Sequence, residues 1–67
     1  MEGVTVGAMI LGARKAKGLT QEQLAGRIGI SRAQIANVEV GKSDMPMKML
    51  RRFADALECK ARDLIPF

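Results

Sequence analysis

The sequence has no histidine and only one cysteine, Cys59. One cysteine cannot form a disulfide within the chain, and without histidine it cannot complete the set of ligands that a structural zinc site needs. General acid–base catalysis most often uses histidine, and the sequence places no pair of carboxylates in a defined cleft. We therefore expect no metal, no cofactor and no enzymatic activity.

Long apolar runs are also missing. The longest apolar stretch, near the N-terminus, is far too short to cross a bilayer. An acidic residue precedes this stretch and an Arg-Lys pair follows it, which is the reverse of the order in a secretory signal peptide. Together with the unpaired thiol of Cys59, this predicts a cytoplasmic protein that does not contact a membrane.

Aromatic residues make up only 3% of the chain, whereas leucine, alanine, methionine and isoleucine are abundant. This composition favours helices over sheet. The 67 residues allow one small domain, and the hydrophobic content of 48% is that of a folded chain. We expect a single all-α domain over residues 1–67, stabilised by a packed helical core or by a partner chain.

Basic residues outnumber acidic ones, with 11 Lys and Arg against 7 Asp and Glu, which gives a net charge of +4 and a pI near 9.9. A surplus of this kind suits a polyanionic partner, nucleic acid first. It suits a soluble basic domain without such a partner equally well. Charge alone therefore does not decide the function.

Capping residues, glycines and apolar spacing divide the chain into five helical segments. Thr20 and Ser31 each begin a capping box, with Gln23 and Gln34 three residues later. Gly18, Gly29 and Gly41 supply left-handed stops after the first three segments. The predicted segments run over about 6–17, from Thr20 to Gly29, over about 32–40, from Pro46 to about Glu58, and over about 61–65.

The second and third segments are joined so tightly that they must cross at a steep angle, which predicts a helix-turn-helix unit over about residues 20–40. Gly29 provides the positive φ of the turn, and Ala25 is small enough for the crossing backbones to approach each other. Ile35 and Val38 face the core. The opposite face carries Ala33, Ala36, Asn37 and Val40, with Arg32 and Gln34 on its flanks. Such a helix fits a major groove, which is about 12 Å wide.

Residues 19–65, LTQEQLAGRIGISRAQIANVEVGKSDMPMKMLRRFADALECKARDLI, resemble the lambda-repressor-like, Xre-type helix-turn-helix domains. The matching positions include Leu19-Thr20-Gln21, Leu24-Ala25, Gly29-Ile30-Ser31, Val38-Glu39 and Gly41-Lys42, and the resemblance covers about residues 6–65. It implies a compact five-helix fold. It also implies a sequence-specific regulator of transcription, more often a repressor than an activator, that binds double-stranded DNA at a palindromic operator.

The resemblance also implies which residues meet the DNA. Arg32, Ala33 and Asn37 fall where bases are read, with Gln34 close by. Arginine can bind guanine and asparagine can bind adenine in bidentate pairs, whereas alanine offers only a methyl contact. The implied contacts to the DNA backbone are those of Gln21, Ser31 and Lys42. Two simpler roles stay open, because Gln34 also completes a capping box and Arg32 could be a solvated surface charge.

The resemblance further implies an ion pair between Arg14 and Glu39 that fixes the angle of the third helix. Three positions depart from the family pattern. Val40 replaces a polar residue, and Asp44 places a negative charge in the loop that would approach phosphates. Glu58 stands where glycine or asparagine is usual, which predicts a turn that is either strained or differently shaped.

A homodimer is expected, because one such domain buries limited surface on DNA. Ile65 and Phe67 are apolar residues near the C-terminus with little chain left to cover them, so we expect them at the two-fold interface. Two alternatives stay open at this point. The chain could be an interaction module that binds another protein through the third helix, or a small partner of a toxin or restriction system that binds both DNA and protein.

Overall fold

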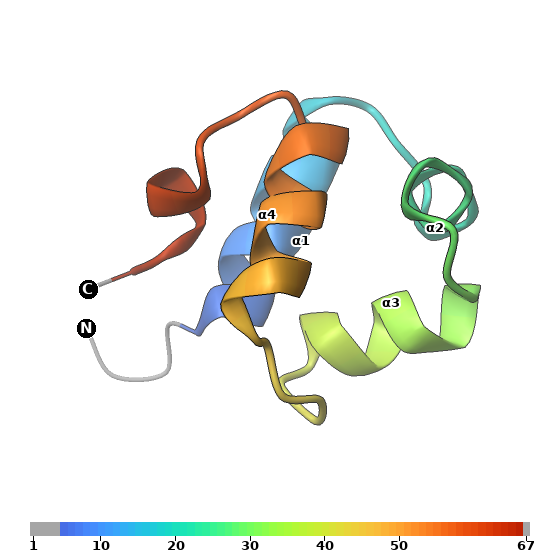
Figure 1. Ribbon diagram of the computed structural model, residues 1–67. Coiled ribbons are helices and arrows are strands. Elements are labelled where there is room, and N and C mark those ends of the chain that lie inside the picture. Colours follow the sequence, from blue (N-terminus) through green and yellow to red (C-terminus); the bar gives the residue numbers. More distant parts are fainter. Residues whose placement is uncertain (1–4, 67) are drawn as a thin grey trace.

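The computed structural model describes residues 5–66, which form four α-helices and one 3-10 helix (Figure 1). Their bounds are Val6–Ala16 (α1), Gln21–Ile28 (α2), Arg32–Glu39 (α3), Met47–Ala56 (α4) and Ala61–Leu64 (η1). The all-α prediction is confirmed, since these described residues include no strand. The last predicted segment, a short turn at about 61–65, is a single turn of 3-10 helix, a form that suits a segment of only four residues, so the predicted count of five helices is met only if this turn is included.

The fourth helix is shorter than the sequence pattern predicted. Pro46 is extended, with φ −61° and ψ 150°, and it lies at the N-cap rather than inside the helix. At the other end Glu58 has a φ of 57°, a left-handed conformation that no α-helix can continue through. The predictions that α1 reaches Lys17 and that α3 reaches Val40 were each wrong by one residue.

The starts of the first three helices are fixed by local hydrogen bonds. Thr5 Oγ1 accepts from the N–H of Ala8 at 3.1 Å, which caps α1. At α2, Thr20 Oγ1 accepts from the N–H of Gln23 at 3.0 Å, and Gln23 Oε1 accepts from the N–H of Thr20 at 2.8 Å. This reciprocal pair satisfies donors that a helix start otherwise leaves unpaired.

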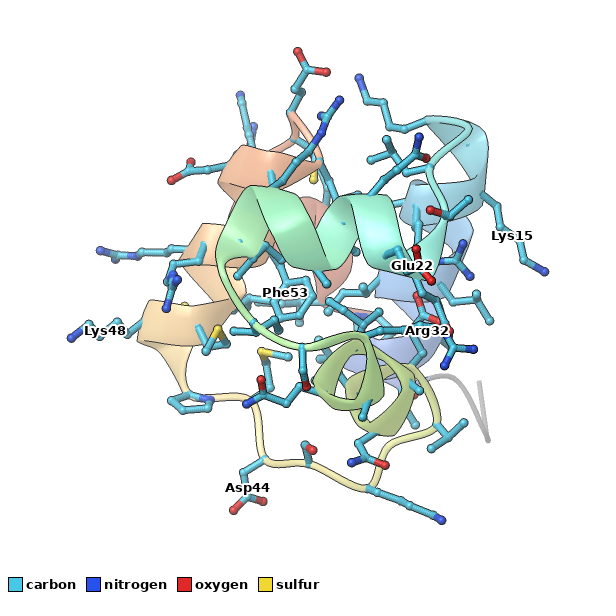
Figure 2. All side chains as sticks on the ribbon, turned by 90° about the vertical axis from the view of Figure 1, so that its right-hand side faces the viewer. Lys15, Glu22, Arg32, Asp44, Lys48 and Phe53 are labelled. Carbon is cyan, nitrogen blue, oxygen red and sulfur yellow. The ribbon has the colours of Figure 1, made fainter. Side chains whose placement is uncertain are left out.

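The core lies where all five elements meet, with the ring of Phe53 near its centre (Figure 2). α2 packs on α3 and α4, α1 packs on α3, and η1 covers α1 and α4. The buried apolar side chains are Ile10, Leu24, Ala25, Ile28, Ile35, Val38, Leu50, Phe53, Ala54, Leu57 and Leu64. α3 is thus held through one face only, by its contacts with α1 and α2.

α1 passes close to the backbone of α3 at Gly7, a position to which the sequence analysis gave no role. A Cβ atom at Gly7 would lie 2.0 Å from the carbonyl oxygen of Val38 and 3.0 Å from that of Glu39. Because both neighbours are backbone atoms, neither can turn aside as a side chain would. Gly7 therefore sets the distance between α1 and the C-terminal end of α3.

Two arginines connect α2 to α4 through the carbonyl groups at helix ends. Arg52 Nη2 donates to the carbonyl oxygen of Ile28, and Arg27 Nη1 donates to that of Ala56 at 3.1 Å. Carbonyls in the last turn of a helix lack donor partners within it, so these side chains satisfy them and hold the two helices together.

The left-handed turn at Glu58 leads to a stability prediction. A residue with a Cβ pays about 1–2 kcal/mol for this conformation and glycine does not, so Glu58→Gly should stabilise the fold by about 1 kcal/mol. The substitution also removes the exposed Lys17–Glu58 ion pair at 3.4 Å, which contributes little. Thermal unfolding followed by circular dichroism should show a midpoint raised by about 4–8 °C. Glu58→Ala, which loses the same carboxylate but keeps a Cβ, should show no such rise.

Candidate nucleic-acid interface

α3 divides cleanly into a buried and an exposed face. Ile35, Val38 and Glu39 are buried at a spacing of three and four residues, which places them on one side of the helix. Ala36 lies half-buried at the border. The exposed side chains are Arg32, Ala33, Gln34 and Asn37, and Val40, which follows the helix, is exposed as well. The side chains that the sequence predicted for base reading therefore share the face of α3 that points away from the core.

The start of α3 is held by the second capping box. Gln34 Oε1 accepts from the N–H of Ser31 at 2.8 Å, and Ser31 Oγ accepts from the N–H of Gln34 at 3.1 Å. The capping role for Gln34 is thus present in the structure. It leaves the Gln34 amide nitrogen and the Ser31 hydroxyl hydrogen available as donors at the exposed end of α3.

The far end of α3 is held by a buried carboxylate that gathers donors from α1 and α2. Arg14 Nε donates to Glu39 Oε2 at 2.6 Å, and Arg14 Nη2 lies 3.4 Å from Oε1. Gln21 Nε2 donates to the same Oε1 at 2.9 Å. Arg14 Nη1 reaches the carbonyl oxygen of Leu19 at 2.7 Å. No buried side-chain nitrogen or oxygen of the described residues is left without a partner.

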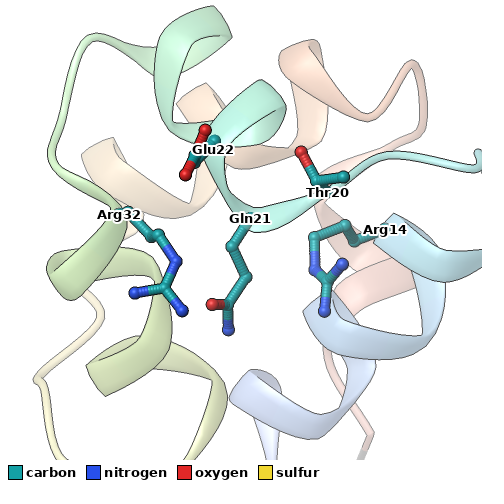
Figure 3. Close-up of a pocket in the computed structure, with 5 residues that line it drawn as sticks. All are labelled: Arg14, Thr20, Gln21, Glu22 and Arg32. Carbon is teal, nitrogen blue, oxygen red and sulfur yellow. The ribbon is translucent and has the colours of Figure 1, made fainter.

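A notch of about 460 Å³ separates the starts of α2 and α3 (Figure 3). In the close-up, Arg32 and Gln21 extend toward each other from the two helices. α2 also directs its first N–H groups and the positive end of its dipole to this side. The notch can therefore take an anion such as a backbone phosphate. It is lined by Arg14, Thr20, Gln21, Glu22 and Arg32.

Charges of both signs border the exposed face of α3. Arg32 and Lys42 are exposed cations, and Glu22 and Asp44 are exposed carboxylates. Glu22 lies near Arg32, whereas Asp44 lies farther along, in the loop beyond α3 (Figure 2). Lys42 and Asp44 lie in the loop that follows α3. Because these charges partly cancel, affinity for a polyanion at this face would depend on a few well-positioned hydrogen-bond donors more than on a strong positive electrostatic potential.

The remaining predicted site residues lie away from α3. Ile65 is half-buried and packs against the core, so it is better covered than its place near the C-terminus suggested. Phe67 lies outside the described residues.

Cys59 also packs against the core, and its burial, followed by the negative charge of Asp63, raises the pKa of the thiol. This favours the unreactive protonated form. None of the helices formed by residues 5–66 has the length and apolar character that crossing a bilayer requires.

The decisive comparison is with models of known protein families. The model described as "Helix-turn-helix" (HTH_3) matches residues 10–64, which is most of the chain. The chain belongs to the HTH_3 family. These are the lambda-repressor-like, Xre-type domains of DNA-binding regulators of transcription. A comparison with the curated proteins gave no match.

Solved structures of HTH_3 domains and similar regulators superpose closely on this one. The restriction-modification controller protein C.AhdI from Aeromonas hydrophila is 34% identical, with a TM-score of 0.87 over 92% of this chain and 94% of that one. The controller C.Esp1396I is 28% identical, with a TM-score of 0.81 over 91% of this chain and 79% of that one. The biofilm regulator SinR, solved in complex with DNA, is 23% identical, with a TM-score of 0.81 over 90% of this chain and 97% of that one, and this likeness concerns the fold alone.

Sequence reasoning on this HTH_3 domain missed the hydrogen bond from Gln21 to Glu39 and the role of Glu22 in lining the notch. Gln21 is eighteen residues from Glu39, and no local pattern links the two positions. The family resemblance pointed to Gln21 only as a phosphate donor. The signal that could have pointed to this hydrogen bond was the position of Glu39 on the buried face of α3. A buried carboxylate needs several hydrogen-bond donors, so a second donor besides Arg14 could have been sought.

Proposed function

We propose that this HTH_3 protein is a cytoplasmic repressor of transcription that binds a palindromic operator as a homodimer, with α3 in the major groove. In this proposal Arg32 and Asn37 bind base edges, Ala33 offers a methyl contact, and Gln34 adds the donor left free by the capping box. Gln21, Ser31 and Lys42 donate to phosphates on either side of the groove. The protein needs no cofactor and catalyses no reaction.

The observation that carries the proposal is the exposure of one polar face of a rigidly held helix. Arg32 and Asn37 are exposed although α3 is fixed at one end by the capping box of Ser31 and at the other by the Glu39 carboxylate. Asparagine is a poor helix former, so its place in the middle of a short exposed helix face favours a role in recognition. A rigid helix presents such side chains with little loss of freedom on binding.

Base reading can be tested by selecting bound sites from random duplexes with the wild-type protein, Arg32→Ala and Asn37→Ala. Each substitution should cost about 1–3 kcal/mol on the selected site and relax the preference at one base position per half-site, because each removes one bidentate pair. Lys42→Ala is the matched control, since loss of a phosphate contact should weaken all sequences alike and leave the consensus unchanged. An identical consensus from all four proteins would remove Arg32 and Asn37 from base reading.

A homodimer is proposed because a single recognition helix of this size makes too few contacts with DNA for high affinity. A pair of domains on two half-sites about 34 Å apart doubles the contacts and explains a palindromic site. We keep Ile65 and Phe67 as the proposed interface residues. The identity of 34% with a restriction-modification controller makes the promoters of such a system the first natural targets to test.

A second function is favoured by one observation. Val40 is 68% exposed at the end of α3, where a polar side chain would suit DNA better. With the exposed Ala33 it offers a small apolar surface for a protein partner. Salt separates the two functions, since DNA binding through several phosphates should weaken steeply as the salt concentration rises, whereas an apolar protein interface should hardly respond.

A further inference from the structure

Gln21 differs from the other two glutamines of the chain in the way its carboxamide is held. Its Nε2 donates to Glu39 Oε1 at 2.9 Å, whereas Gln23 and Gln34 accept through Oε1 in their capping boxes. Gln21 is the first residue of α2, and Glu39 is the last residue of α3. A carboxamide at the start of one helix is therefore held by a carboxylate at the end of the next.

Glu39 does not need Gln21 to balance its charge. Arg14 already supplies a charged donor at 2.6 Å to one oxygen and a second nitrogen at 3.4 Å to the other. The hydrogen bond from Gln21 instead fixes which end of its carboxamide faces Glu39. A carboxylate only accepts hydrogen bonds, so the amide nitrogen of Gln21 must face Glu39, since a flipped carboxamide would place its oxygen against a carboxylate oxygen. Glu39 thus determines the orientation of the Gln21 carboxamide.

The orientation leaves one donor free at the notch. An amide nitrogen carries two hydrogens, and Glu39 Oε1 occupies one of them. Gln21 lines the notch and extends into it beside Arg32 (Figure 3). The side-chain freedom that a mobile glutamine would lose on binding a phosphate is already lost in the free protein.

We propose that Glu39 is a positioning residue for DNA binding, which holds the Gln21 carboxamide so that its second N–H donates to one phosphate oxygen of the duplex. This inference rests on the proposed function. It gives the buried ion pair a role beyond fixing the angle of α3, because Glu39 then controls a contact to the DNA backbone made by another helix.

The test is a scan of the selected duplex with single methylphosphonates, each of which removes the charge of one phosphate. With the wild-type protein, one position per half-site near the α2 start should weaken binding by about ten- to a hundredfold, the size of a hydrogen bond to a charged group. In Gln21→Ala and in Glu39→Gln the penalty at this position should fall below about twofold, since that hydrogen bond is no longer made. A glutamine at position 39 has one acceptor oxygen, which Arg14 takes, and its amide nitrogen faces that of Gln21.

Arg27→Ala is the control for a general loosening of α2. It removes the hydrogen bond from Arg27 to the carbonyl oxygen of Ala56 and leaves the bond from Gln21 to Glu39 intact, so the phosphate penalty should stay at its wild-type value. The inference is overturned if Glu39→Gln keeps the penalty, if Arg27→Ala loses it, or if no phosphate depends on Gln21. Failure of the wild-type protein to bind any duplex would instead overturn the proposed function.

A measurement on the free wild-type protein tests the bond even where Glu39→Gln does not fold. Hydrogen exchange of the glutamine side-chain amides can be followed by NMR, with Gln23 and Gln34 as internal references whose nitrogens are free. The Gln21 amide hydrogen that is bonded to Glu39 should exchange at least about tenfold more slowly than those of the other two side chains, because it is donated to a buried carboxylate. Equal exchange rates for the three side chains would overturn the inference.

Discussion

Gly7→Ala should strongly destabilise the protein, although alanine is normally the better helix former. The new Cβ would lie 2.0 Å from the carbonyl oxygen of Val38, so α1 and the end of α3 must separate. We expect a loss of about 3 kcal/mol or more, which is most of the stability that a core of this size supplies. Urea unfolding followed by far-UV circular dichroism measures the loss.

Gly12→Ala is the matched control on the same helix. Apart from the adjacent residues and the backbone of α1 itself, no atom lies within 4 Å of a Cβ at Gly12, so alanine should stabilise the protein there by up to about 1 kcal/mol. Gly7→Ala and Gly12→Ala are the same chemical change, and they should shift the free energy of unfolding in opposite directions. A Gly7→Ala variant that unfolds at the wild-type urea concentration would show that α1 does not approach α3 as closely as described.

Glu39→Leu should be nearly as damaging, because it leaves the guanidinium of Arg14 buried without its carboxylate. Arg14 is 9% exposed and Glu39 is 7% exposed, so water cannot replace the lost partner. Breaking a buried pair in this way costs about 3–5 kcal/mol. Chemical unfolding of the purified variant, or its failure to fold, gives the measurement.

The double variant Arg14→Met with Glu39→Leu separates the cost of an unpaired charge from the value of the pair. Replacing both partners by apolar side chains is often neutral or stabilising, so the double variant should recover most of the loss. It should still bind DNA less well, because Gln21 then has no acceptor to hold it. A double variant as unstable as the sum of the two single ones would contradict this account of the ion pair.

Local chemistry is the part of the fold that could be read from the sequence. Thr20 and Ser31 form the capping boxes that their spacing predicted, and Gly18, Gly29 and Gly41 have φ values of 70°, 86° and 79° as expected of helix stops. The capping boxes and the glycine stops depend on residues within a few positions of one another, so a local pattern is enough to predict them. Glu58 is different, because its unusual turn was expected from the family resemblance, and its φ of 57° is the strained one of the two alternatives.

Contacts between distant segments could not be read in the same way. The close approach at Gly7 depends on where α3 ends in space, and the Arg52 hydrogen bond to Ile28 depends on how α4 packs on α2. The exposed face of α3 was predicted, because buried positions repeat at helical spacing. The orientation of Gln21 was not, because a carboxamide takes its direction from whichever partners tertiary packing brings to it.

The central claim is that the exposed face of α3 enters a DNA groove. The most direct measurement is an NMR titration of the wild-type protein with its selected duplex, read as amide shifts and protein–DNA contacts along the chain. The account predicts that the largest shifts and the contacts to bases fall on residues 31–40, with contacts to the DNA backbone at Gln21 and Lys42. Base contacts confined to α4 or η1, with α3 unchanged, would contradict it.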